Sequence, residues 1–325
     1  MIRFLPRLTE LRRGKPPGKQ RQVIVFIHGI FSSHATFAEL IDSFEHDVRF
    51  DSFDLFAYDY DWGEPIVTSA EKLRDILNRR VPEGSEITLI GHSMGGLVSR
   101  FAIIAGDLRG VKRLFMLGTP NFGALSARQL STLWQTAIAA AGKVSPVFPR
   151  KAGLRDLTQP QTLYKRIATR PSEPPARAAH VEYVTIPGLF YWDERRDTDP
   201  GEQNQALPFT GGTLLLRVMA LWPFGQIEIE IPHDGIVEES SVNMMPAKGR
   251  ISEKNIALQQ PTTNGRTYCH AAPISMHDCA HMGIQRDEKT AETIKGIMLA
   301  AGGVAWKQAL SPDQINSYIG TIEAH

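Results

Sequence analysis

The run GHSMGG at residues 91–96 contains a serine with glycines two positions before it and two positions after it. This G-x-S-x-G spacing allows a sharp backbone turn that exposes the serine hydroxyl. The apolar segment EITLI precedes the run and LVSRFAIIA follows it, so a strand is expected to enter the turn and a helix to leave it. We therefore predict that Ser93 is a nucleophile. The alternative is a structural serine in a glycine-rich turn.

A nucleophilic serine also needs fixed N–H donors, which stabilise the oxyanion that forms when it attacks a carbonyl group. The tripeptide HGI at residues 28–30 ends an apolar, strand-like run and is expected to lie beside the serine turn. The backbone N–H groups of Ile30 and Met94 are the predicted donors, with Phe31 as the alternative to Ile30. His28 is expected to hold this loop in place without reacting.

An acidic residue that orients the base is expected after Ser93 and before the catalytic histidine. The run PHDGIV at 232–237 offers Asp234, which is followed by a glycine and suits a tight loop at a strand end. Three other aspartates, Asp193, Asp197 and Asp199, lie in the charged stretch DERRDTD, which is typical of a solvated surface. Asp234 is therefore the predicted acid.

Three histidines near the C-terminal end compete for the role of base. The base must reach both Ser93 and Asp234, so we expect it on a loop just before the last packed helix. His281 fits, because a short turn and then a helix over residues 287–301 follow it. His277 lies one helical turn earlier, and His270 lies further back and fits least.

The same region has a composition that could bind a metal ion. Within 13 residues lie two cysteines, three histidines and one aspartate: Cys269, His270, His277, Asp278, Cys279 and His281. No C-x₂-C pair is present, although His277 and His281 would share one face of a helix. We predict no metal and no other cofactor, with a zinc site as the alternative. A disulfide between the two cysteines stays open.

The surrounding sequence alternates between apolar runs and helical periods. Strands are predicted at 22–28, 54–59, 86–91, 111–117 and 181–187, and helices at 37–44, 67–77 and 95–105. Such alternation with short connections predicts an α/β domain with a mostly parallel sheet flanked by helices, here covering residues 22–325. The alternation breaks at about 124–178 and 189–231, and we predict that these are lid-type insertions. The first of them contains an amphipathic helix over residues 130–141.

Taken together, these motifs resemble α/β-hydrolases of the lipase and serine-esterase type, such as bacterial triacylglycerol lipases and GPI inositol-deacylase-like esterases. The matching pieces are HGI at 28–30, GHSMGG at 91–96, LGTPNFG at 117–123, DGIV at 234–237 and HMGI at 281–284. The resemblance implies hydrolysis of carboxylic esters through an acyl-enzyme, with Ser93 as nucleophile, His281 as base and Asp234 as the orienting acid. It implies no direct catalytic role for Asn121. One departure is that the start of the chain lacks clear antiparallel edge strands, which predicts a trimmed sheet.

The expected substrate is a small-molecule or lipid ester with an apolar acyl chain. A thioesterase or acyltransferase that uses the same residues is the alternative among enzymes. A catalytically silent hydrolase fold that acts as a binding module is the alternative from another class. It is disfavoured because no component of the site is missing from the sequence.

The composition excludes several other classes of protein. The 325 residues are 42% hydrophobic and 22% charged, as in an ordinary globular protein, and the net charge of +1 argues against a nucleic-acid partner. Seven of the basic residues fall within residues 1–21, which contain Glu10 as their single acid. We expect this segment to be a solvated basic tail, or alternatively a short helix that contacts an anionic membrane surface. No signal-peptide or membrane-spanning run is found, so the expected location is cytoplasmic, with the membrane periphery as the alternative.

Overall fold

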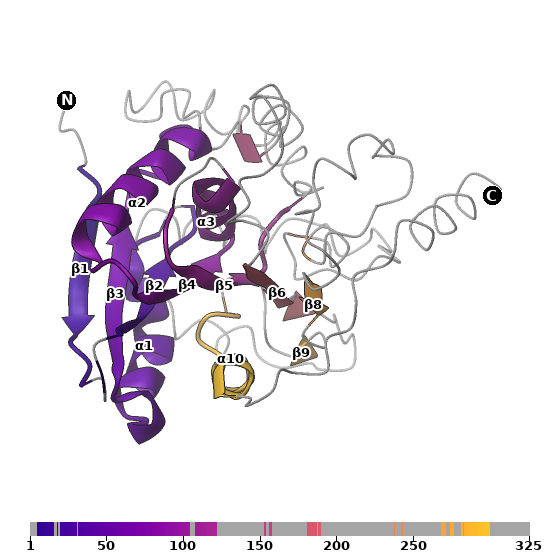
Figure 1. The fold of residues 1–325 in the computed structure, drawn as a ribbon. Coiled ribbons are helices and arrows are strands. Elements are labelled where there is room, and N and C mark those ends of the chain that lie inside the picture. The colour runs from indigo at the N-terminus through magenta and orange to yellow at the C-terminus, as the bar shows by residue number, and fades with distance from the viewer. Residues whose placement is uncertain are drawn as a thin grey trace, which may run out of the picture.

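The computed structural model describes residues 5–15, 18, 20–30, 32–104, 108–121, 153, 156–157, 181–186, 188–189, 237, 242, 268–270, 274–275, 281 and 283–299. Their centre is a seven-stranded sheet with the spatial order β1-β3-β2-β4-β5-β6-β8 (Figure 1). The seven strands, in chain order, are β1 (Arg7–Arg12), β2 (Gln22–Ile27), β3 (Phe53–Asp59), β4 (Glu86–His92), β5 (Val111–Leu117), β6 (Glu182–Ile186) and β8 (Tyr268–His270). A separate pair of short parallel strands is formed by β7 (Gly188–Leu189) and β9 (Ile274–Ser275).

Neighbouring strands from β3 to β8 run parallel to one another. The chain crosses from β2 to β3 and then returns to β4 on the other side of β2, so β2 lies near the middle of the sheet. The carboxyl ends of β2 and β4 therefore meet at one edge of the sheet. Ligands in open parallel sheets bind outside these ends, next to a strand where the order reverses.

Helices cover both faces of the sheet (Figure 1). The helices α2 (Ile66–Arg80) and α3 (Met94–Ile104) pack on one face, and α1 (Ala38–Glu45) and α10 (Glu288–Leu299) pack on the other. Strand β2 contributes to both layers, because Val23 and Val25 face α2 and α3 while Phe26 faces α1. This two-sided burial explains the continuous apolar run of β2. Short 3₁₀ turns at His34–Phe37 and Val48–Phe50 flank α1.

The predicted α/β architecture is confirmed. The five predicted strands correspond to β2, β3, β4, β5 and β6, and the predicted helices correspond to α1, α2, α3 and α10. Strand β8 was not predicted. The insertions at about 124–178 and 189–231, including the helix at 130–141, lie almost entirely outside the described residues, as does everything after residue 299. Within the described ranges, no helix has both the length and the apolar character needed to cross a membrane.

The N-terminal segment differs from its prediction. Residues Arg7–Arg12 form β1, which pairs antiparallel with β3 at the edge of the sheet, so the expected tail or membrane-surface helix over residues 1–21 is wrong there. The expected absence of an antiparallel edge strand is wrong for the same reason. Strand β1 could not be predicted from the sequence, because Leu8 is the one fully buried side chain of this strand. An edge strand rich in charged residues shows no clear alternation of apolar and polar residues.

The basic residues of this segment make structural contacts. The guanidinium of Arg12 donates hydrogen bonds to the carbonyl oxygens of Phe44, Glu45 and Phe50, at 3.1, 3.0 and 2.6 Å. Two of these carbonyls belong to the last turn of α1, where a cation is favourable. Arg21 forms an ion pair with the buried Asp54 of β3. Part of the N-terminal positive charge therefore stabilises the sheet edge and α1.

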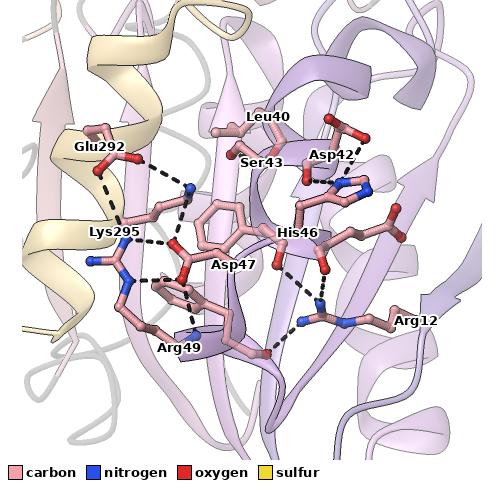
Figure 2. Close-up of polar contacts among 12 residues, drawn as sticks. Arg12, Leu40, Asp42, Ser43, His46, Asp47, Arg49, Glu292 and Lys295 are labelled. Carbon is pink, nitrogen blue, oxygen red and sulfur yellow. Dashed lines mark hydrogen bonds and ion pairs between the residues drawn. The ribbon is translucent and has the colours of Figure 1, made fainter.

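Helix α10 is attached to the rest of the domain by an ionic cluster in which Lys295 is buried and Arg49 and Glu292 are exposed (Figure 2). The Lys295 ammonium lies 3.3 Å from a carboxylate oxygen of Asp47 and 3.3 Å from one of Glu292. Asp47 also accepts a 2.6 Å contact from Arg49, which lies 4.0 Å from Glu292. These contacts lower the pKa of Asp47 well below its usual range, with the hydrogen bond from Arg49 as the largest cause. The cluster joins the last described helix to the turn that follows α1.

Candidate active site

Ser93 lies alone between the end of β4 and the first residue of α3. Its φ of 52° is left-handed, and among the described residues it is the one non-glycine residue with a positive φ. Its N–H donates to the carbonyl oxygen of Leu117 in β5 at 2.8 Å, and its own carbonyl oxygen accepts from the N–H of Gly96 at 3.1 Å. A left-handed conformation costs an L-residue about 1–2 kcal/mol, so neighbouring contacts must maintain this turn. The predicted sharp strand-to-helix turn is present.

Two glycines lie where other backbone segments come close to the turn at Ser93. A side chain on Gly95 would overlap the carbonyl oxygen of Ile27, because the first turn of α3 lies directly against the end of β2. A Cβ atom on Gly29 would lie 3.0 Å from the Cβ atom of Ser93. The loop that follows β2 therefore passes immediately beside the serine, and glycine makes this passage feasible at both positions.

The two predicted oxyanion donors lie on these same segments. Ile30 follows Gly29 in the loop beside Ser93 and is partly buried. Met94 is the first residue of α3 and is fully buried. The first N–H groups of a helix have no partner within the helix, so this position suits a donor to an external oxygen. Phe31, the alternative to Ile30, lies outside the described residues.

The contacts of His28 fit the structural role predicted for it. The backbone N–H of Tyr60 donates to its Nε2 atom at 3.3 Å, which places the ring proton on Nδ1, where it is donated to the carbonyl oxygen of Gly29 at 2.8 Å. The hydroxyl of Tyr60 donates to the carbonyl oxygen of His28 at 2.8 Å, and the two rings stack. Burial lowers the pKa of His28, which keeps the ring neutral. His28 therefore fixes the start of the loop.

Asp59 fixes the other end of this loop, a role that the sequence did not reveal. Its carboxylate accepts from the backbone N–H of His34 at 2.9 Å and contacts Nδ1 of the same residue at 2.6 Å. His28 is therefore attached to Tyr60, the residue after β3, and His34 is attached to Asp59, the last residue of β3. The sequence signal that was available is an aspartate at the carboxyl end of a parallel strand, a position that commonly faces a site.

His281 is brought to the turn that carries Ser93. It is buried, with 3% of its surface exposed, and it precedes α10 as predicted. Its carbonyl oxygen lies 2.8 Å from Nε2 of His92, and the two imidazole rings have centroids 4.9 Å apart. The structure therefore places the predicted base against the residue that immediately precedes the predicted nucleophile.

The remaining predicted site residues are not all described. Asp234 and His277 lie outside the described residues, and His270 is described only by its backbone, as the last residue of β8. Three residues beyond Asp234, Val237 is buried in the interior. Among the described side chains no group of three or more potential metal ligands occurs. The cysteine and histidine cluster of the zinc alternative has a described side chain at His281 alone.

A buried polar bridge links the site to the segment after the predicted acid. Asn121, in the run LGTPNFG, donates from Nδ2 to the carbonyl oxygen of Val242 at 2.9 Å. Its Oδ1 atom accepts from Nη1 of Arg100 at 3.3 Å, and both side chains are completely buried. Arg100 belongs to α3, so the bridge joins the helix after Ser93 to the segment eight residues beyond Asp234. The run LGTPNFG is one of the motifs recognised in the sequence, but no function was predicted for Asn121.

Comparisons with known proteins agree with this architecture. The model of the alpha/beta hydrolase family matches residues 24–240. Among solved structures, the mature lipase BlEst2 from Bacillus licheniformis aligns at 18% identity with a TM-score of 0.51, covering 85% of this chain and 93% of the lipase. Phospholipase PlaB from Legionella pneumophila aligns at 16% identity with a TM-score of 0.51, covering 94% of this chain and 63% of the phospholipase. Among curated proteins, none matches this chain.

Proposed function

The chain belongs to the alpha/beta hydrolase family, and from this premise we propose that it is a serine hydrolase that cleaves carboxylic esters. The observation that carries the proposal is the left-handed Ser93 between β4 and α3, next to a residue that contacts His281. A serine held in this way presents its hydroxyl at the carboxyl edge of the sheet, where the loop after β2 also lies.

We assign the chemical roles as follows. The Ser93 hydroxyl attacks the ester carbonyl carbon while the imidazole of His281 takes its proton. The backbone N–H groups of Ile30 and Met94 donate to the resulting oxyanion, and loss of such a donor typically slows catalysis by about 10²–10³-fold. The protonated His281 then transfers its proton to the departing alkoxide, which leaves as an alcohol. His281 then takes a proton from water, which attacks the acyl-enzyme, and the protonated His281 returns the proton to the Ser93 oxygen as the carboxylic acid is released.

Asp234 is the proposed partner of His281. A carboxylate beside the base holds its ring in the productive tautomer and stabilises the imidazolium that forms during the reaction. The buried bridge from Arg100 through Asn121 to Val242 supports this assignment, because it attaches the segment after Asp234 to the helix that follows the nucleophile. The proposed substrate is an ester with an apolar acyl chain. The names of the lipase and the phospholipase compared above suggest this class.

The test is labelling with a fluorophosphonate probe, together with hydrolysis of short p-nitrophenyl esters. Wild type is expected to react with both, and Ser93→Ala is expected to react with neither. Ser99→Ala is the matched control, because Ser99 is a completely buried serine of α3 whose hydroxyl donates to the carbonyl oxygen of Gly95. It should label as wild type does. Hydrolysis by Ser93→Ala at the wild-type rate would overturn the proposal.

A further inference from the structure

The turn that holds the proposed nucleophile also holds a direct contact to the proposed base. We infer that His92 is a positioning residue, whose ring N–H fixes the main chain of His281 and thereby sets the base relative to Ser93. The inference rests on the proposed function of the same site. It concerns a residue that neither attacks the substrate nor accepts the proton of Ser93.

The contact is buried and joins distant parts of the chain. Nε2 of His92 lies 2.8 Å from the carbonyl oxygen of His281, which is 189 residues later in the sequence. The two residues are 1% and 3% exposed, and their rings lie 4.9 Å apart at an interplanar angle of 44°. A contact of this kind shields the hydrogen bond from water and lets the ring of His92 support that of His281 from the side.

The direction of the hydrogen bond determines the state of the His92 ring. A carbonyl oxygen only accepts, so the ring proton lies on Nε2. Nδ1 is buried and makes no hydrogen bond to any described residue, and a Cβ atom on Gly29 would lie 3.1 Å from it. Burial holds the pKa of His92 well below its ordinary value, and the nearby His281 contributes in the same direction. The ring therefore remains a neutral donor while His281 gains and loses its proton.

This arrangement makes the geometry of nucleophile and base interdependent. Residues 92 and 93 are consecutive, so the group that anchors the base is attached to the same rigid turn as the group that attacks. Without the hydrogen bond, the main chain at His281 loses this anchor and can shift. A displacement of about 1 Å in a reacting group can cost about 10²-fold in rate. The loss should appear in the chemical step and not in substrate binding.

Two substitutions at residue 92 distinguish the effect of the hydrogen bond from the effect of having any polar side chain there. In His92→Gln the amide nitrogen is the same number of bonds from the backbone as Nε2 of histidine, so it can donate to the carbonyl oxygen of His281. In His92→Asn the amide is one methylene shorter and reaches only the position of Nδ1. The readouts are kcat and KM for a p-nitrophenyl ester, the rate of fluorophosphonate labelling, and the thermal midpoint of each variant.

We expect His92→Asn to lower kcat and the labelling rate by about 10–100-fold with KM within about threefold of wild type, and His92→Gln to recover most of this loss. Wild-type rates in His92→Asn would overturn the inference, and so would a folded His92→Gln that is as slow as His92→Asn. If His92→Asn does not fold, His92→Met, of similar length but without a donor, replaces it in the comparison. Ser93→Ala in the same assays tests the proposed function separately, since its loss of activity stands whatever the variants at residue 92 do.

Discussion

The nucleophile and the base are held in place by different kinds of structure. Ser93 is positioned by the backbone, through a left-handed turn, two close glycine contacts and a hydrogen bond from its N–H to β5. His281 is positioned by side chains from distant segments. Its carbonyl oxygen is held by His92, and the helix that follows it is attached through the ionic cluster of Asp47 and Lys295.

The difference separates what is encoded locally from what is assembled by the fold. Six consecutive residues carry the sequence signature of the turn at Ser93, and those residues tolerate little change because backbone atoms surround them. The base depends on contacts between segments that are about 190 and 250 residues apart in the sequence. A single substitution that distorts the backbone of the turn should therefore abolish activity. Removing the side-chain contacts around His281 one at a time should instead lower activity gradually.

The largest expected effect comes from removing the base itself. His281→Ala should lower kcat by several orders of magnitude, because members of a catalytic triad act as a unit. His270→Ala and His277→Ala should remain within about tenfold of wild type. The measurement is the rate of p-nitrophenyl ester hydrolysis by the three purified variants. A dead His277→Ala with an active His281→Ala would contradict the assignment of the base, and simultaneous loss of activity and of a bound metal in all three would favour the zinc alternative.

The nucleophile region could be predicted from the sequence better than the base region, because the first is encoded locally and the second is assembled from distant segments. The turn at Ser93 has a residue-level signature, because glycines are needed where backbones approach closely and strand and helix periods flank them. The strands β2, β4 and β5 are buried on both faces and read as apolar runs. Strand β1 carries one fully buried apolar side chain, Leu8, and one that is partly buried, Leu11. No local pattern reveals that Arg12 binds the end of α1 or that His92 reaches His281. Such contacts exist only after the chain has folded.

The ionic cluster that attaches α10 should give a smaller effect, on stability. Asp47→Asn leaves the buried Lys295 ammonium with Glu292 as its remaining carboxylate, and we expect a loss of about 2 kcal/mol in the free energy of unfolding. Denaturant unfolding measures this loss. Amide hydrogen exchange should become faster in α10 and stay unchanged in β4, because local opening follows the contacts that are lost.

The pH dependence of the stability loss in Asp47→Asn is the control for this prediction. The pKa of Asp47 is depressed in the folded protein, so its contribution to stability is fully present above the ordinary value of about 3.9 and is lost as the pH falls towards the folded value. The stability difference between wild type and Asp47→Asn should therefore shrink between pH 5 and pH 2. A difference that stays constant over this range would show that the ionised carboxylate is not what stabilises α10.

The smallest effect tests the backbone strain at the nucleophile. Ser93→Gly and Ser93→Ala both remove the hydroxyl, but only glycine adopts a φ of 52° without steric cost. Alanine in this conformation costs about 1–2 kcal/mol, whereas glycine makes the unfolded chain more flexible by about 0.4–1 kcal/mol. We therefore expect Ser93→Gly to be more stable than Ser93→Ala by about 0.5–1 kcal/mol in denaturant unfolding. Ser99, in the middle of α3, is the matched control, because there the order should reverse and glycine should be less stable than alanine by about 1 kcal/mol. If Ser93→Gly proves the less stable of its pair, the turn stores no strain and the backbone account of the nucleophile region is wrong.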